Sequence, residues 1–263
     1  MSIFIVIAAA VAACAGQSEA LAELRANIEK ARIEYDAKFG ESLIPAAQAL
    51  ISANPSDAAA QFALADLAVV IAEMMRMDYE NNDTMEMRDK RLLGRHADEI
   101  AEIGLSTLRA MPDSSEKFRM MADLYATMIR SKFQGKKYSN NMDDSARKAL
   151  ELDPGNANAY VTACKRMLFA KPRYGGDVGA ALAMLDRAIE LDPKNVRAHI
   201  FRGLAWEKLG ELDKAVKDWE EALALDPKCA PGLDHIKRVK DKDMGFEGDD
   251  EAGSAEGEAT PEE

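Results

Sequence analysis

The feature that most constrains the fold is a six-residue pattern that occurs three times. Residues 149–154, 188–193 and 222–227 each contain Ala, an aliphatic residue, a variable residue, Leu, Asp and Pro in that order. The prolines that end the last two copies, Pro193 and Pro227, are 34 residues apart. A repeat of this length is typical of stacked pairs of antiparallel helices, in which each pair buries its apolar side against the next.

The segment between these two prolines has the side chains that a tight helix pair requires. Small residues let two helices approach closely and aromatic residues fill the space between them; these residues are Gly203, Ala215, Ala222, Trp206 and Trp219. Pro227 then ends the second helix, since proline lacks the amide hydrogen that a helix needs. In these positions the segment resembles the tetratricopeptide-repeat family, although Arg202 stands where that family prefers Leu.

The earlier repeats are less regular. Intervals of 39, 42 and 57 residues separate Pro193, Pro154, Pro112 and Pro55 in turn, so longer helices or loops are expected there. Residues 18–39 and 41–53 are expected to form one more pair that breaks at Gly40, and residues 231–242 a closing helix. We therefore predict an all-α, tetratricopeptide-like helical-repeat solenoid of about five antiparallel helix pairs plus a capping helix, over residues 21–242.

The N-terminus indicates a targeting segment. Residues 3–13 form an uncharged apolar run that is too short to span a bilayer as a mature helix. The last residues of this run and the residue after it, Val11-Ala12-Ala13-Cys14, resemble a bacterial lipobox. The resemblance implies a signal peptide over residues 1–14, lipidation of Cys14 and a short linker over residues 15–20. No Lys or Arg precedes the run, so plain secretion and a buried apolar N-terminus remain alternatives.

Composition excludes some classes of partner and reaction. The net charge is -12, whereas a nucleic-acid-binding surface must be basic. Three Cys and three His leave little for a metal site or a disulfide framework. We predict no cofactor and no catalysis: Cys164 is expected to be a buried inert thiol and His199 a partnered interhelical residue. A hydrolase that uses a groove carboxylate remains a minor alternative.

Residues 243–263 are predicted to be an acidic disordered tail. Residues 245–263 contain eight acidic side chains and no basic one, a composition that cannot bury enough apolar surface to fold alone. A solubilising role is the simplest interpretation, and a specific docking motif is the alternative.

In tetratricopeptide-repeat proteins, the first helix of each pair lines a concave binding face. The resemblance therefore implies a groove in this chain, and its expected lining is Arg119, Asp123, Asn158, Val161, Lys165, Arg197, Ile200 and Leu204. Three of these are cations that would attract carboxylates on a small organic acid or on a partner protein. We expect them to be exposed and to contribute little to stability. A solvated helix face without a ligand is the alternative for each residue.

Two further segments could contribute to binding. Pro172 should end a helix, after which Arg173, Tyr174, Gly175, Gly176 and Asp177 form either an ordinary turn or a basic and aromatic rim of the groove. Five methionines, Met74, Met75, Met77, Met85 and Met87, could pack in a core, line an adaptable apolar ligand surface or bind Cu(I).

The lipobox, the degenerate repeats and the glycine-containing loop together resemble the tetratricopeptide lipoproteins associated with TRAP transporters. This resemblance implies a non-catalytic lipoprotein of the bacterial cell envelope. It would be lipid-anchored and face the periplasm, on the outer rather than the inner membrane, and would bind a periplasmic solute-binding protein or its solute. The alternative is an outer-membrane assembly or scaffold lipoprotein that binds peptides or protein segments.

Overall fold

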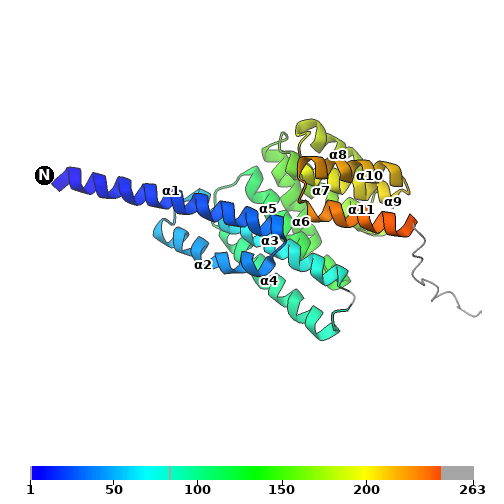
Figure 1. Cartoon of the computed structure of the whole chain (residues 1–263), viewed down its shortest axis with the longest axis horizontal. Helices are drawn as coiled ribbons and strands as arrows, with labels where there is room; N and C mark the ends of the chain where they lie inside the picture. The colour runs from blue at the N-terminus through cyan, green and yellow to red at the C-terminus, as the bar shows by residue number, and fades with distance from the viewer. Residues whose placement is uncertain (1, 83, 244–263) are drawn as a thin grey trace, which may run out of the picture.

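The computed structural model describes residues 2–82 and 84–243, which form helices and no strands (Figure 1). The α-helices are α1 (Ser2–Glu34), α2 (Ala37–Ala53), α3 (Ala58–Asn81), α4 (Met87–Arg109), α5 (Ser115–Thr127), α6 (Lys132–Leu152), α7 (Ala157–Phe169), α8 (Val178–Leu191), α9 (Val196–Lys208), α10 (Leu212–Leu225) and α11 (Ala230–Asp243). A 3-10 turn, η1 (Pro172–Tyr174), precedes α8. Successive helices form five pairs followed by α11, which confirms the predicted helical-repeat solenoid.

Polar residues after the turns start the helices, as the sequence predicts. Side chains of the capping residues accept hydrogen bonds of 2.9–3.2 Å from amides in the first turn; the caps are Asp57, Ser114, Asn156, Asp177 and Asn195. Each bond satisfies an amide that has no partner within its helix. Four of these caps, Asp57, Ser114, Asn156 and Asn195, begin the inner helices α3, α5, α7 and α9.

The first helix pair breaks at a different residue from the one predicted. Helix α1 ends at Glu34, Tyr35 has a left-handed φ of 54°, and Asp36 caps α2 by accepting from the Phe39 amide at 2.9 Å. Gly40 lies inside α2 and is buried. A Cβ on Gly40 would lie 2.9 Å from Ile71 Cγ1, so this glycine permits close packing of α2 on α3. The prediction of a break at Gly40 was wrong because the cap at Asp36 already ends the turn.

The odd-numbered helices form the inner layer. Helix α3 contacts α5, α5 contacts α7, and α7 contacts α9, while each also packs on the following helix of its own pair. In a stack of helix pairs, the layer through which successive pairs contact one another lies on the concave side, which here consists of α3, α5, α7 and α9.

The apolar core is divided along the chain. One cluster of buried side chains draws on α1 to α6, a second on α7 to α9, and a third on α9 to α11. Polar contacts cross the junction between the first two clusters: Asn156 Nδ2 donates to Ser115 Oγ at 2.9 Å, and Arg166 pairs with Asp143. Charged and polar groups therefore help to hold the later repeats on the earlier ones.

Helix α3 is the core helix of the first cluster. By length and composition it is the one helix of the described residues that could cross a membrane, but 67% of an apolar 18-residue stretch within Ala58–Glu80 is buried inside the fold. Met74 and Met75 are buried in its core, which agrees with the packing interpretation for these two, whereas Met87 at the start of α4 is 63% exposed.

The two ends of the chain are only partly described. Helix α1 runs without a break through residues 15–20, the predicted linker. The side chain of Cys14 lies outside the described part of the structure, as do residues 244–263 of the predicted tail, so lipidation and tail disorder stay predictions.

Candidate functional site

A buried carboxylate, that of Asp123 on α5, organises the inner face. Asp123 is 0% exposed and accepts hydrogen bonds from Arg119 Nη1 at 2.5 Å, Lys165 Nζ at 2.7 Å and Thr162 Oγ1 at 2.9 Å. Arg197 of α9 contributes longer contacts of 3.3 Å. One acidic side chain thus joins three successive inner helices, α5, α7 and α9.

The electrostatics of this cluster favour the ionised carboxylate. Burial by itself raises the pKa of Asp123, because a charge is poorly solvated inside a protein. Arg197, Lys165 and Arg119 oppose that effect and hold the pKa of Asp123 far below its usual range. Asp123 is therefore charged at any physiological pH.

A second carboxylate reaches the cluster from a distant repeat. Glu73 Oε1 on α3 lies 3.1 Å from Lys165 Nζ and 3.4 Å from Arg197 Nη2, which are 92 and 124 residues further along the chain. Burial raises the pKa of Glu73, but these two cations outweigh it and lower the pKa overall. The charges of α3, α5, α7 and α9 therefore meet in one place, which we call the Asp123 cluster.

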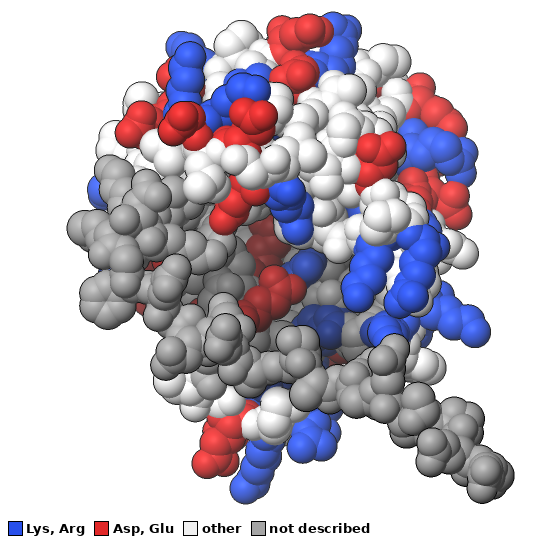
Figure 2. Space-filling model, turned by 90° about the vertical axis from the view of Figure 1, so that its right-hand side faces the viewer, with Lys and Arg blue, Asp and Glu red and all other residues white. Residues whose placement is uncertain are grey.

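The accessible edge of the Asp123 cluster consists of Arg197 and Glu73. The side chains of Arg197 and Glu73 are 32% and 37% exposed, whereas those of Arg119 and Lys165 are 6% and 8% exposed. Figure 2 shows one face of the molecule that is hollowed, with both acidic and basic side chains in the hollow. Glu116 of α5, which pairs with Arg119 at 2.6 Å and is 46% exposed, is a further accessible group beside the cluster.

The structure brings four of the predicted groove residues together, but not as free cations. Arg119 and Lys165 were expected to be exposed; they are buried because α5 and α7 pack closely and Asp123 supplies the opposite charge. Removal of one partner from such a buried pair typically costs about 3–5 kcal/mol. The expectation that these cations are exposed is therefore wrong for Arg119 and Lys165, and we expect the loss of either to be destabilising.

The other predicted groove residues lie elsewhere. Val161 belongs to the second core cluster and Ile200 to the third, so both point into the protein. Leu204 is partly buried against both clusters. Asn158 is partly exposed and accepts a hydrogen bond from Asn195 Nδ2 at 3.1 Å. Asn158 and Leu204 therefore remain at the surface of the inner helices.

The loop before α8 has a fixed shape. Gly175 has a φ of +93°, and a Cβ on Gly176 would lie 1.8 Å from the Ala170 carbonyl oxygen. Arg166 Nε donates to the Tyr174 carbonyl at 2.8 Å, so the loop is also tied to α7. Asp177 caps α8, as predicted.

This loop also presents exposed side chains. Tyr174 is 51% exposed and Arg173 stacks over its ring, with the guanidinium carbon 5.0 Å from the ring centroid. Whether Arg173 and Tyr174 bind a partner stays a prediction, but the loop holds them in a defined place.

A charged network across α8, α9 and α10 explains the departure of Arg202 from the repeat pattern. Arg202 Nη2 lies 2.6 Å from Asp218 Oδ1, and Arg202 Nη1 lies 2.9 Å from Asp186 Oδ1. His199 is buried beside it, with one ring nitrogen 3.4 Å from Asp218 and the other 3.1 Å from the Pro193 carbonyl. His199 is thus a partnered interhelical residue, as expected. No sequence pattern predicts the contact with Asp186, which lies on α8.

Cys164 is buried on α7, as expected. Burial raises the pKa of its thiol to about 12, so the reactive thiolate is scarce at neutral pH. Cys164 and Cys229 are both free and buried, with no disulfide between them.

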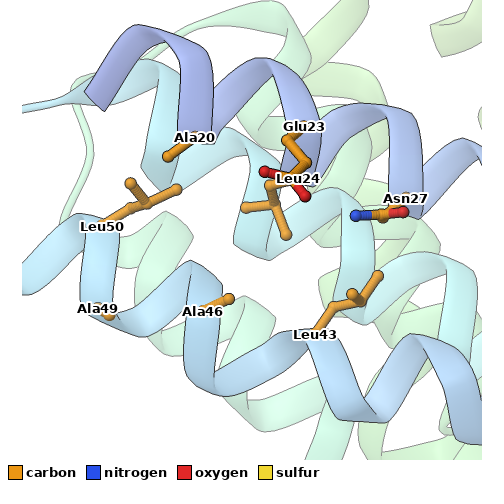
Figure 3. Close-up of a pocket in the computed structure, with 8 residues that line it drawn as sticks. All are labelled: Ala20, Glu23, Leu24, Asn27, Leu43, Ala46, Ala49 and Leu50. Carbon is orange, nitrogen blue, oxygen red and sulfur yellow. The ribbon is translucent and has the colours of Figure 1, made fainter. Parts of the chain in front are cut away.

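An apolar cleft between α1 and α2 was not foreseen from the sequence (Figure 3). It has a volume of about 420 Å³, and Leu24 of α1 faces Leu43 and Leu50 of α2 across it, with Glu23 and Asn27 on the α1 side. No repeat motif marks these residues, so only the packing of the two helices reveals the cleft.

Comparisons with known proteins agree with this fold. Residues 173–232 match the family model described as tetratricopeptide repeat. An FK506-binding protein-like protein from Rattus norvegicus is 33% identical over 82 residues, which are 31% of this chain and 22% of that protein. A DnaJ homolog subfamily C member 7 homolog from Schizosaccharomyces pombe is 34% identical over 67 residues, which are 26% of this chain and 14% of that protein. The matches therefore span less than a quarter of these relatives' lengths.

Among solved structures, a thermophilic tetratricopeptide-repeat protein from Thermus thermophilus is similar over 84% of this chain and 99% of its own. Its TM-score is 0.53 and its sequence identity is 16%. This likeness shows the helical-repeat fold alone, and the family match covers α8, α9, α10 and the first residues of α11.

Proposed function

We propose that this chain, with its tetratricopeptide repeat at residues 173–232, is a non-catalytic adaptor that binds a protein partner through the inner helices α5, α7 and α9. Tetratricopeptide repeats generally mediate protein–protein binding, and the odd-numbered helices form the concave side of this stack. The observation that carries the proposal is the partly exposed edge of the Asp123 cluster, where Arg197 and Glu73 meet on that side.

The chemistry of this edge favours a carboxylate. Arg197 is held by longer contacts of 3.3–3.4 Å to Glu73 and Asp123. Its guanidinium can therefore release Glu73 and bind a carboxylate from outside the fold instead. An acidic side chain of a partner, or a small organic acid carried by it, would meet Arg197 after displacing Glu73. Asn158 and Leu204 would add polar and apolar contacts beside it.

The proposed setting is the bacterial cell envelope, with the chain held at a membrane by lipid on Cys14. The proposed partner is the periplasmic solute-binding protein of a TRAP-type transporter, as the lipobox and the loop at residues 172–177 imply. A scaffold lipoprotein that binds peptides or protein segments is the second candidate, because an inner face of helical repeats suits an extended peptide equally well.

Site-specific photo-crosslinking in cells that produce the protein distinguishes the two candidate partners. A photoreactive amino acid at Asn158, on the inner face, is compared with the same group at Arg187, an exposed residue of α8. We expect a discrete adduct at position 158 only, identified by mass spectrometry as a solute-binding protein. A peptide or an assembly factor at position 158 would favour the scaffold, and equal adducts at both positions would refute binding on the inner face.

A further inference from the structure

The start of α6 carries an unusual exposed surface. Phe133 is 79% exposed, more than any other large apolar side chain that the structure describes. Lys132, Lys136 and Lys137 are also exposed. At 100° per residue, these four side chains fall within an arc of about 140° on one side of the helix. We call this set the Phe133 patch.

The Phe133 patch is basic in a chain that is otherwise acidic. Residues 124–142 contain no Asp or Glu, while the whole chain has a net charge of -12. Lys132 and Lys136 have no ion-pair partner among the described residues. Lys137 lies over the Tyr138 ring, 4.6 Å from its centroid. The positive charge of these lysines is therefore largely uncompensated within the fold.

The neighbouring acids on α4 are already engaged. Asp98 and Glu102 interact with Lys137 electrostatically. However, Asp98 Oδ1 lies 2.6 Å from Arg130 Nη2, and Glu102 Oε1 lies 2.5 Å from Arg109 Nη1. A group that covers the patch would need negative charge for the lysines, because burying an unpaired cation is costly, and apolar surface for the Phe133 ring.

We propose that the C-terminal segment, residues 244–263, docks on the Phe133 patch of the same molecule. This segment has eight acidic residues, no basic one and a single aromatic residue, Phe246, so it complements the patch in both charge and apolar character. Electrostatic attraction to the lysines brings the segment in, and apolar contact with Phe133 would then fix its register.

The geometry of the chain allows this contact. Helix α11 ends at Asp243, so the segment starts there with 20 residues. Fully extended, it could span up to about 70 Å. A compact chain of this size has a radius of gyration of about 18 Å. Covalent attachment gives a tethered segment of this length an effective concentration on the order of millimolar, which lets weak ionic contacts suffice.

Zero-length crosslinking of carboxylates to lysines in the full chain tests the proposal. We expect crosslinks from the acidic residues of 244–263 to Lys132, Lys136 or Lys137. Because K132E/K136E/K137E removes the amines that this chemistry needs, that variant is tested with a photoreactive amino acid in place of Phe246. Its adducts with residues 132–138 should fall about tenfold, as three exposed pairs are lost. Salt of about 1 M should have a similar effect, because it shortens the screening length to about 3 Å.

The matched control is K194E/K217E/K228E, which makes the same charge change at three other exposed lysines and should leave crosslinks to the patch unchanged. Chains with and without ¹⁵N label are mixed, so that a contact within one molecule is distinguished from one between copies. Three results would overturn the proposal: crosslinks only to lysines of α11, crosslinks only between differently labelled chains, or no crosslinks to the patch. Flotation of the full chain with phosphatidylglycerol vesicles, without such crosslinks, would assign the patch to a membrane instead.

Discussion

At the scale of single residues, the stability of the inner face depends most on Asp123. We expect Asp123→Asn to lower the free energy of unfolding by about 3–5 kcal/mol, because Arg119 and Lys165 would stay buried without a full counter-charge. Urea unfolding at pH 7 measures this. The control is Asp144→Asn, whose carboxylate is 70% exposed and pairs with Arg147, and which should cost less than about 1 kcal/mol. An equal loss of unfolding free energy in the two variants would show that the buried ion pairs of Asp123 add no more stability than an exposed pair.

The same carboxylate predicts a pH dependence. The pKa of Asp123 is lower in the folded state than the value of about 3.9 in an unfolded chain, so its contribution is complete above that value. As pH falls below about 4 the unfolded state takes up a proton that the folded state does not, and stability decreases. In Asp123→Asn, the slope of unfolding free energy against pH below pH 4 should be shallower by up to about 1.4 kcal/mol per pH unit. An unchanged slope would contradict the lowered pKa.

Gly176 is required in the loop because no side chain fits at its position. We expect Gly176→Ala to cost about 1–3 kcal/mol, because the new methyl group would overlap the Ala170 carbonyl and force the loop to move. Gly179→Ala is the control: it lies exposed in α8 with its nearest neighbour, an Asp177 carboxylate oxygen, 3.4 Å away, so it should stabilise by about 0.5–1 kcal/mol. Thermal unfolding of both variants checks the difference, and a neutral Gly176→Ala would show that the loop can move freely.

At the scale of helices, Trp219 holds the last repeat together. It is 0% exposed, donates from Nε1 to the Ile200 carbonyl at 3.2 Å and stacks on His235. Trp219→Ala should cost about 3–5 kcal/mol, as for other buried aromatic residues. Because its cluster draws only on α9 to α11, hydrogen exchange should rise mainly there. Trp206→Ala, at a partly exposed ring, should cost less, and an unchanged melting temperature for Trp219→Ala would refute this packing.

At the scale of the whole molecule, the proposed attachment to a membrane depends on Cys14. Cys14→Ser should move the protein from the membrane fraction to the soluble fraction, because no acyl chains would be added. Cys229→Ser, which alters a buried thiol of the last repeat, should leave the distribution unchanged. Cell fractionation and the intact mass of the mature protein measure both. Continued membrane binding of Cys14→Ser, or an unmodified N-terminus beyond residue 14, would contradict the lipoprotein proposal.

The sequence by itself determined the repeat architecture and most helix boundaries. A 34-residue period, prolines after apolar helices and capping residues such as Asn195 act locally, over one or two turns, so they can be read without a structure. The same register also placed Arg119, Asp123, Lys165 and Arg197 on inner helices. The break at Tyr35 was missed because the pattern offers two candidate turns, and only packing against Ile71 assigns Gly40 to the helix.

Only the tertiary structure decided what the inner-face charges do. Glu73 has no motif around it, yet it completes the Asp123 cluster from 92 residues before Lys165. Whether a cation on an inner helix is exposed depends on how tightly successive pairs curve, which is the sum of small rotations at every interface. That curvature brings α3 within reach of α7 and α9. It turns cations that each repeat alone would leave in water into buried partners of two carboxylates.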